Sequence, residues 1–123
     1  MNNMRMYAIV AKDSLQKMNG NRGKLSAQTG HAYLHAYWNS EANYPEHAKA
    51  YKDSDHARKI TLIVDTVDQL LPILDKYSKI CGTTKVVDAG FTVFNEPTFT
   101  CIGIGPISDE LVDDDLKSLK VLI

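Results

Sequence analysis

Hydrophobic positions along the chain switch between short apolar runs and a wider helical spacing. The runs are rich in β-branched residues and are bounded by polar or glycine-containing segments, which is typical of strands. Between them, apolar residues recur every three to four positions, as on one face of a helix. The strands are predicted over residues 5–12, 58–64, 85–87 and 98–104.

The helical spacing predicts two long helices and two short ones. Residues 39–43 are expected to end the first long helix, and Pro72 predicts a local kink in the second. Pro45 favours the start of a short helix because proline is tolerated in a first turn, and Ser108 is expected to cap the last helix. The long helices are predicted over residues 24–38 and 67–80, the latter capped by residues 65–66, and residues 13–23 are predicted to be a polar loop.

The order of these elements predicts one α/β domain, spanning residues 1–123, with a mixed sheet. Pro106 is expected to end the fourth strand, and residues 119–123 are apolar enough to pack as a strand-like tail. There is no internal repeat and no low-complexity segment. The pattern therefore indicates a single α/β fold.

The composition is that of an ordinary globular chain, with 44% hydrophobic and 24% charged residues. The longest apolar run, residues 60–64, is too short to cross a bilayer, and residues 1–7 lack a signal-peptide pattern. Cys81 and Cys101 lack the spacing of a disulfide framework or a zinc site. We therefore expect a protein of the reducing cytoplasm without membrane contact.

Charge is distributed unevenly although the net charge is only −1. Residues 1–60 contain nine lysines and arginines against five acidic residues, whereas residues 61–123 contain five against ten. A polyanion could bind the basic part without the whole chain being basic. A solvated surface with uneven charge explains the composition equally well. The local basic cluster consists of Lys12, Lys17, Arg22 and Lys24.

One face of the predicted first helix carries four polar residues at steps of four, three and four. A lysine in the first helical turn points a cation the same way as the unpaired backbone N–H groups, which attracts phosphate or a developing oxyanion. The alternative is an exposed polar stripe on an amphipathic helix. These residues are Lys24, Gln28, His31 and His35.

A second candidate is Asp88, which follows a short buried strand and precedes a glycine by two positions. α/β proteins bind ligands at such strand ends, and the hydroxyl of Thr92 could orient water there. An ordinary turn aspartate is the alternative. His31 and His35 have metal-compatible spacing but lack the glutamate that follows the first histidine in zinc-protease helices, so no metal site is predicted.

Three segments of the sequence favour a functional role for these candidate residues. Residues 23–32 (GKLSAQTGHA) are similar to a Gly-Lys-x-Ala-Ala-Gln-x-x-His-Ala signature. Residues 88–92 (DAGFT) and 100–106 (TCIGIGP) are similar to Asp-Ala-Gly-x-Thr and x-Gly-Ile-Gly-Pro segments of the same family. In this order and spacing, nearly the whole chain resembles the type-II (archaeal and eukaryotic) peptidyl-tRNA hydrolases.

The resemblance implies an α/β fold with a four-stranded mixed β-sheet flanked by helices on both faces. It implies a homodimer that binds tRNA and cleaves the ester between a peptide and the 3′ ribose, without a metal or organic cofactor. Asp88, alone or through Thr92, would orient and partly deprotonate water, and Lys24 would stabilise the oxyanion or the departing ribose oxygen. The substrate-binding residues would be Gln28, Thr100, His31, Lys17 and Arg22.

The chain also departs from the family pattern. Phe91 stands where the family usually has arginine, and Val93 stands where it has glutamine. Residues 18–22 and 39–58 are longer than the usual connections. Two alternatives therefore accompany the hydrolase: a non-catalytic RNA- or protein-binding module of the same fold, and a hydrolase for a related aminoacyl-tRNA ester.

Overall fold

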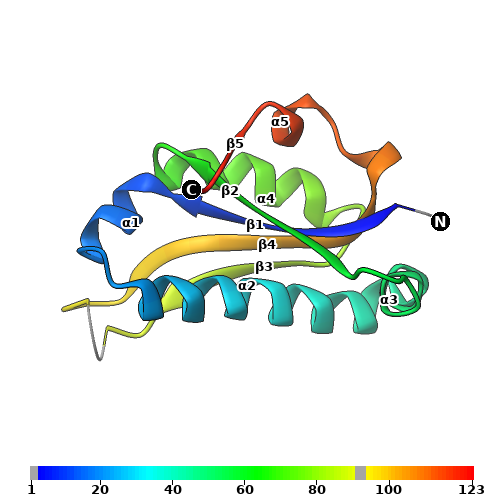
Figure 1. Ribbon diagram of the computed structural model, residues 1–123, viewed down its shortest axis with the longest axis horizontal. Helices are drawn as coiled ribbons and strands as arrows, with labels where there is room; N and C mark the ends of the chain where they lie inside the picture. The colour runs from blue at the N-terminus through cyan, green and yellow to red at the C-terminus, as the bar shows by residue number, and fades with distance from the viewer. Residues whose placement is uncertain (1–2, 91–93) are drawn as a thin grey trace.

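The computed structural model describes residues 3–90 and 94–123, which form one mixed β-sheet between two layers of helices (Figure 1). The strands are β1 (Met4–Ala11), β2 (Arg58–Val64), β3 (Thr83–Asp88), β4 (Thr98–Ser108) and β5 (Lys120–Val121). Their order in the sheet is β3-β4-β1-β2-β5. β1 and β2 are parallel, and the other neighbouring pairs are antiparallel. The predicted α/β class with a mixed sheet is confirmed.

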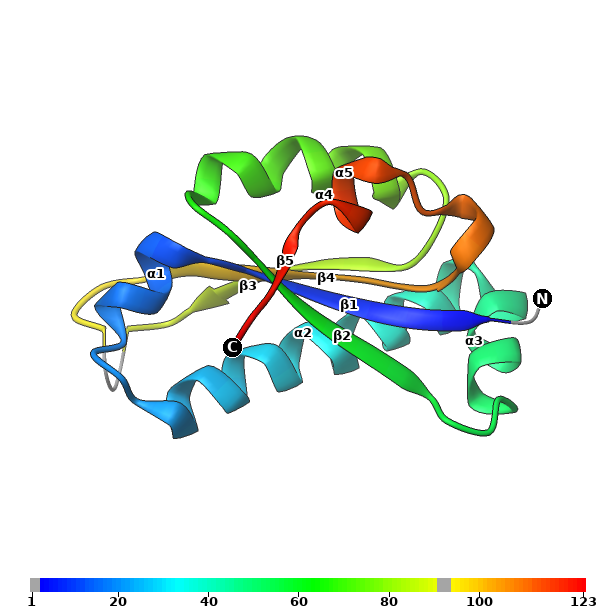
Figure 2. The ribbon, with the colours of Figure 1, turned by 45° about the horizontal axis from the view of Figure 1, so that its top comes forward.

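Helices cover both faces of this sheet (Figure 2). α2 and α3 lie on one face, and α4 and α5 lie on the other. The helices are α1 (Lys12–Lys17), α2 (Arg22–Asn43), α3 (Pro45–Lys52), α4 (Leu70–Ser78) and α5 (Asp114–Lys117), with single 3₁₀ turns η1 (Val67–Gln69) and η2 (Asp109–Leu111). No helix in the described ranges is long and apolar enough to span a membrane.

The central strand β1 is buried on both sides because its side chains alternate between two cores. Tyr7, Ile9 and Ala11 pack in the core beneath α4. Ala8 and Val10 pack in the core beneath α2. The apolar run of β1 is therefore continuous, as the sequence pattern predicted.

α2 packs unusually close to the sheet, and glycine makes this possible. A Cβ atom at Gly103 of β4 would lie only 2.1 Å from the carbonyl oxygen of Ala32. Ala32 and Ala36 are completely buried on the face of α2 that meets the sheet. The small residues thus fix the height of α2 above β3 and β4, and with it the positions of the polar residues on α2.

Residues 13–23 are not the polar loop that was predicted, because α1 occupies their first part. Ser14 is buried, and its hydroxyl donates a hydrogen bond to the carbonyl oxygen of Phe99 at 2.6 Å. Met18, which directly follows α1, is only 1% exposed and packs in the interior. A turn follows, in which Asn19 (φ 52°) and Gly20 (φ 77°) both adopt the left-handed conformation.

The predicted break of the first long helix is also wrong, since α2 continues to Asn43. Ser40 is fully buried, and the Asn39 side chain accepts a hydrogen bond from the Thr83 N–H at 3.1 Å. These polar side chains therefore face the interior of the protein and do not end the helix. Pro45 begins α3, as predicted.

The helix predicted over residues 67–80 begins as a 3₁₀ turn and becomes α-helical at Leu70. Thr66 and Gln69 form a reciprocal capping box, which confirms the predicted cap. Pro72 falls in the first turn of α4, where its missing N–H costs little.

The sheet has five strands, not the four implied by the family resemblance. The predicted strand-like tail contributes β5, which pairs antiparallel with β2. Pro106 does not end β4, which continues to Ser108, because the β1–β4 pairing is irregular there and proline is tolerated at such irregularities. Ser108 begins η2 without a side-chain cap, since its hydroxyl donates to the carboxylate of Glu110.

Candidate active site

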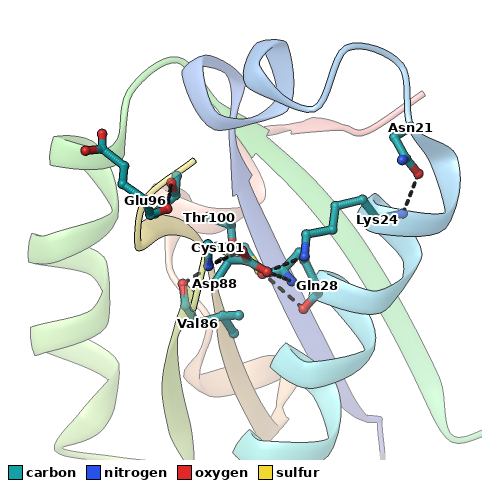
Figure 3. Close-up of polar contacts among 10 residues, drawn as sticks. Asn21, Lys24, Gln28, Val86, Asp88, Glu96, Thr100 and Cys101 are labelled. Atoms are coloured by element: carbon teal, nitrogen blue, oxygen red, sulfur yellow. Dashed lines mark hydrogen bonds and ion pairs between the residues drawn. The ribbon is translucent and has the colours of Figure 1, made fainter. Parts of the chain in front are cut away.

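The two signature segments meet at one end of the molecule. The start of α2, the end of β3 and the short helix α1 lie together there (Figures 1 and 2). The Lys24 ammonium group donates a hydrogen bond to Oδ1 of Asp88, forming an ion pair (Figure 3). The side chains of Lys24 and Asp88 are 13% and 9% exposed, so the pair is largely shielded but reachable from solvent.

Local sequence explains why Lys24 starts the helix at this point. Asn21 is the N-cap of α2, and its side-chain oxygen accepts a hydrogen bond from the Lys24 backbone N–H at 2.9 Å. The Lys24 ammonium also lies 5.7 Å from the centre of the Phe94 ring, within cation–π range. The lysine is therefore held both by its backbone and by its side chain.

Asp88 receives three hydrogen bonds from the described residues. Its Oδ1 atom accepts from Lys24 and, at 3.2 Å, from the Gln28 amide. Its Oδ2 atom accepts from the Gly90 N–H at 2.9 Å, across a turn in which Gly90 has φ +87°. A carboxylate has about four acceptor positions, so one remains for a water molecule or a substrate group.

These contacts determine the charge of Asp88. Burial raises its pKa, but the hydrogen bonds from Lys24, Gly90 and Gln28, with the positive charge of Lys24, outweigh burial. The net result is a pKa below the usual value of 3.8. Asp88 is therefore a carboxylate at neutral pH, and a weak base.

Gln28 is fixed by a buried chain of hydrogen bonds. The Thr100 hydroxyl, completely buried, donates to Oε1 of Gln28 at 2.7 Å, which leaves the Gln28 NH₂ group to donate to Asp88. Gln28 is itself only 3% exposed. The hydrogen bonds from Thr100 to Gln28 and from Gln28 to Asp88 therefore tie the position of the carboxylate to that of β4 (Figure 3).

A β-bulge in β4 orients the Thr100 side chain towards this site. The pairing steps from Val86 opposite Cys101 to Val87 opposite Phe99, so that Thr100 is the extra residue. Adjacent side chains in a regular strand point to opposite faces. Here both the Thr100 hydroxyl and the Cys101 thiol contact Gln28, the thiol through the backbone carbonyl at 3.5 Å.

Two grooves open beside the ion pair. One, of about 380 Å³, lies between α2 and β3 and reaches Asp88 and Gln28; the exposed His31 also lines it. The other, of about 460 Å³, is lined by Lys17 of α1 and by Phe94, which contacts Lys24. The ion pair therefore has solvent-accessible space on two sides.

The predicted site residues divide into three groups. Lys24, Gln28, Asp88 and Thr100 form one connected network. His31, Lys17 and Arg22 are exposed around it. Thr92, like the family departures Phe91 and Val93, lies outside the described residues.

Three residues that support this network were not among the candidates from the sequence. Asn21 and Gly90 had usable signals: an N-cap residue three positions before Lys24, and a glycine two positions after an aspartate, which is typical of a turn. Phe94 had no signal, because its contact with Lys24 depends on the return of the chain towards β4. Among the described residues, no three His, Cys, Asp or Glu side chains are close enough together to hold a metal ion.

Fold and site together define a class: a small α/β protein in which a lysine and a carboxylate meet at a strand end between two grooves. Two archaeal proteins named peptidyl-tRNA hydrolase are similar to this chain. The protein of Haloquadratum walsbyi is 36% identical over 93% of this chain and 96% of its own length. That of Metallosphaera sedula is 31% identical over 97% of this chain and its own full length.

A third relative, the peptidyl-tRNA hydrolase of Methanothermobacter thermautotrophicus, is 34% identical over 82% of this chain and 88% of its own length. The model of the family "Peptidyl-tRNA hydrolase PTH2" matches residues 4–122. The chain belongs to the peptidyl-tRNA hydrolase PTH2 family.

Proposed function

We propose that the pair of Lys24 and Asp88 carries the hydrolysis of peptidyl-tRNA by this chain. Membership of the family makes the protein an ester hydrolase that acts on peptidyl-tRNA. The observation that supports this site is the convergence of the two signature segments, 64 positions apart, in one ion pair beside open grooves. The bond to be broken joins the peptide carbonyl to the 3′ ribose oxygen.

Asp88 is better suited to hold water than to deprotonate it fully. A carboxylate with a lowered pKa is a weak base, but three hydrogen bonds fix its remaining acceptor position. A water molecule bound there would be oriented towards an ester carbonyl lying over the site. Thr92 remains predicted to assist in this step.

Lys24 would supply the electrostatic stabilisation. Attack on the carbonyl creates an oxyanion, and departure of the ribose oxygen creates a second negative charge. The ammonium group is held beside Asp88, so its positive charge would lie next to an ester carbonyl that faces the bound water. Because these charges exist only during the reaction, the contact favours the transition state over the bound ester.

Gln28 and Thr100 would act as positioning residues. Both side chains are buried and bonded to each other, and only the Gln28 amide reaches Asp88. Their contribution would be to hold the carboxylate oxygen in one orientation. For the completely buried Thr100 this position supports an indirect role, whereas Gln28 also lines the groove beside Asp88.

The tRNA would approach over α1 and the start of α2. Lys12 and Lys17 of α1 and Arg22 at the start of α2 are exposed, and these elements lie at the end of the molecule that holds the site (Figure 2). Phosphate contacts from these residues would bring the 3′ ester to Lys24 without taking part in the chemistry.

Two further properties are proposals, a homodimer, which the family resemblance implies, and a cytoplasmic location, which the cysteine usage favours. Leu34 and Trp38 of α2 are 46% and 52% exposed, and their apolar surface supports self-association. Sedimentation equilibrium of the wild-type chain and a Trp38→Ala variant would detect it.

The proposed activity is tested with N-acetyl-aminoacyl-tRNA and the purified chain in EDTA. Release of free tRNA with multiple turnovers is expected. tRNA binding without release would support the binding module instead. Cleavage of D-aminoacyl-tRNA in preference to the N-acetylated ester would support the related esterase.

A further inference from the structure

The groove beside Asp88 follows the outer edge of β3. One wall consists of six consecutive residues, 84–89, and the other of the α2 side chains Gln28, His31 and His35. Asp88 and Gln28 lie at the end that holds the ion pair. The groove therefore leads away from the proposed site along the strand, over a length of roughly 20 Å.

The outer side of β3 has no strand partner among the described residues. β3 is the last strand of the sheet, and no described strand lies beyond it. The Gly82 carbonyl accepts from Gly105 of β4 at 2.8 Å, whereas the Thr83 N–H points away from β4 and donates to Asn39. Since an antiparallel strand alternates in this way, Lys85 and Val87 direct their N–H and C=O groups into the groove.

We propose that the peptide part of the substrate binds in this groove as an added strand on β3. This inference rests on the proposed function, because the ester must lie at Asp88. The peptide's C-terminal carbonyl carries the ester, and β3 ends at Asp88. The peptide therefore runs parallel to β3, with its upstream residues beside Val87 and then Lys85.

Main-chain pairing recognises a peptide without reading its side chains. The exposed edge groups of two residues can make up to four hydrogen bonds, which covers about three to four residues of an extended peptide. His31 and His35 cover one face of the bound strand. The side chains of the peptide alternate between these histidines and solvent.

Charge favours the peptide over nucleotides in this groove. Among the described residues that line it, Lys85 is the single lysine or arginine, and its ammonium lies 4.6 Å from the centre of the Phe99 ring. Phe99 packs with the core beneath α4, on the other face of the sheet. The exposed cations suited to phosphates, Lys17 and Arg22, are instead at the end of α1 and the start of α2.

The test uses N-acetyl-oligoalanyl-tRNA substrates with one to six alanines. We expect kcat/KM to rise roughly tenfold or more up to three or four residues and then to level off, because each main-chain hydrogen bond contributes a factor of about five. N-methylation of one peptide nitrogen should lower the gain at alternate positions only, since alternate residues face β3.

Variants locate the effect on β3. Val87→Pro and Lys85→Pro remove one edge N–H each, and proline is tolerated where a strand N–H faces outward. The ratio of kcat/KM between the four-residue and one-residue substrates should fall towards one. Val87→Ala and Lys85→Ala keep the N–H and should keep the ratio.

Each outcome decides between the possibilities. No hydrolysis of any substrate overturns the proposed function itself. Hydrolysis without dependence on peptide length, or equal loss on all lengths in the proline variants, overturns the added strand. If a proline variant unfolds by circular dichroism, the N-methyl series still decides.

Discussion

The ion pair of Lys24 and Asp88 depends on a chain of hydrogen bonds behind it. Thr100 donates to Gln28, and Gln28 donates to Asp88. Removal of the Thr100 hydroxyl leaves the buried Gln28 oxygen without its strongest partner, which costs about 1–3 kcal/mol of stability.

We therefore expect Thr100→Val to lower kcat roughly tenfold with little change in KM, because Asp88 loses its fixed orientation while substrate contacts remain. Thr100→Ser keeps the hydroxyl and should restore most of kcat. Steady-state kinetics of both variants separate positioning from general destabilisation. Equal kcat losses in the serine and valine variants would argue against a positioning role.

The pKa of Asp88 predicts how stability depends on pH. Its pKa is below 3.8 in the folded protein, so ionised Asp88 stabilises the fold at every pH above the unfolded-state value. This contribution is lost as the pH falls through the folded-state pKa. The free energy of unfolding of wild type relative to Asp88→Asn should be constant above about pH 5 and decrease below it.

Urea titrations between pH 7 and pH 3 measure this difference. Asp75→Asn, on α4, is a suitable comparison, because Asp75 is 75% exposed. A wild-type advantage that grows as the pH falls would contradict the assigned direction of the shift.

At the scale of elements, the close packing of α2 on β4 predicts opposite effects of two glycine substitutions. Gly103→Ala would place a Cβ 2.1 Å from the Ala32 carbonyl oxygen and must push α2 off the sheet. Gly30 is exposed within α2, and a Cβ there meets nothing within 4 Å.

We expect Gly103→Ala to destabilise the fold by several times the effect of an ordinary surface change, about 2 kcal/mol or more. Gly30→Ala should stabilise it by about 0.5–1 kcal/mol, since glycine is unfavourable inside a helix. Thermal unfolding of both variants provides the measurement. A neutral Gly103→Ala would show that α2 can shift at no cost.

Much of the fold was predictable from the sequence, because the strands and long helices have strong periodicity. The failures have a common physical cause. The polar residues Ser14 and Ser40 are buried and bonded to backbone groups far away in the sequence or on their own helix turn. An assignment based on composition alone places such residues in loops. Only their tertiary contacts show that they belong to helices.

The site was also predictable in part. Lys24 and Asp88 belong to short motifs, and the roles that the family resemblance implies for them in one reaction require the two side chains to meet. The orientation of the Thr100 side chain was not predictable. It depends on a bulge whose position is set by the register of β3 against β4. Neither was the contact of Phe94 with Lys24.

At the scale of the whole molecule, the uneven charge predicts where tRNA binds. Lys17 and Arg22 lie at the end that holds the site, whereas α3, with the exposed Lys49 and Lys52, lies at the opposite end (Figure 1). Replacing Lys17 and Arg22 with alanine should weaken tRNA binding and reduce its salt dependence, because fewer counterions are released.

The matched variant with Lys49 and Lys52 replaced by alanine carries the same change in net charge. It should bind tRNA almost as tightly as wild type. Binding titrations over a salt series compare the two. Equal weakening in both variants would show that only the net charge matters and that α1 and the start of α2 are not the tRNA surface.

The most direct test of the account is single-turnover cleavage of N-acetyl-aminoacyl-tRNA by wild type, Asp88→Asn, Lys24→Met and the control Asp75→Asn. Each variant is first shown to be folded by circular dichroism. Loss of one charged group at the reacting centre should reduce the rate about a hundredfold to a thousandfold in the two site variants, while Asp75→Asn cleaves like wild type. Folded Asp88→Asn and Lys24→Met proteins that cleave at near wild-type rates would contradict the assignment of the active site to this ion pair.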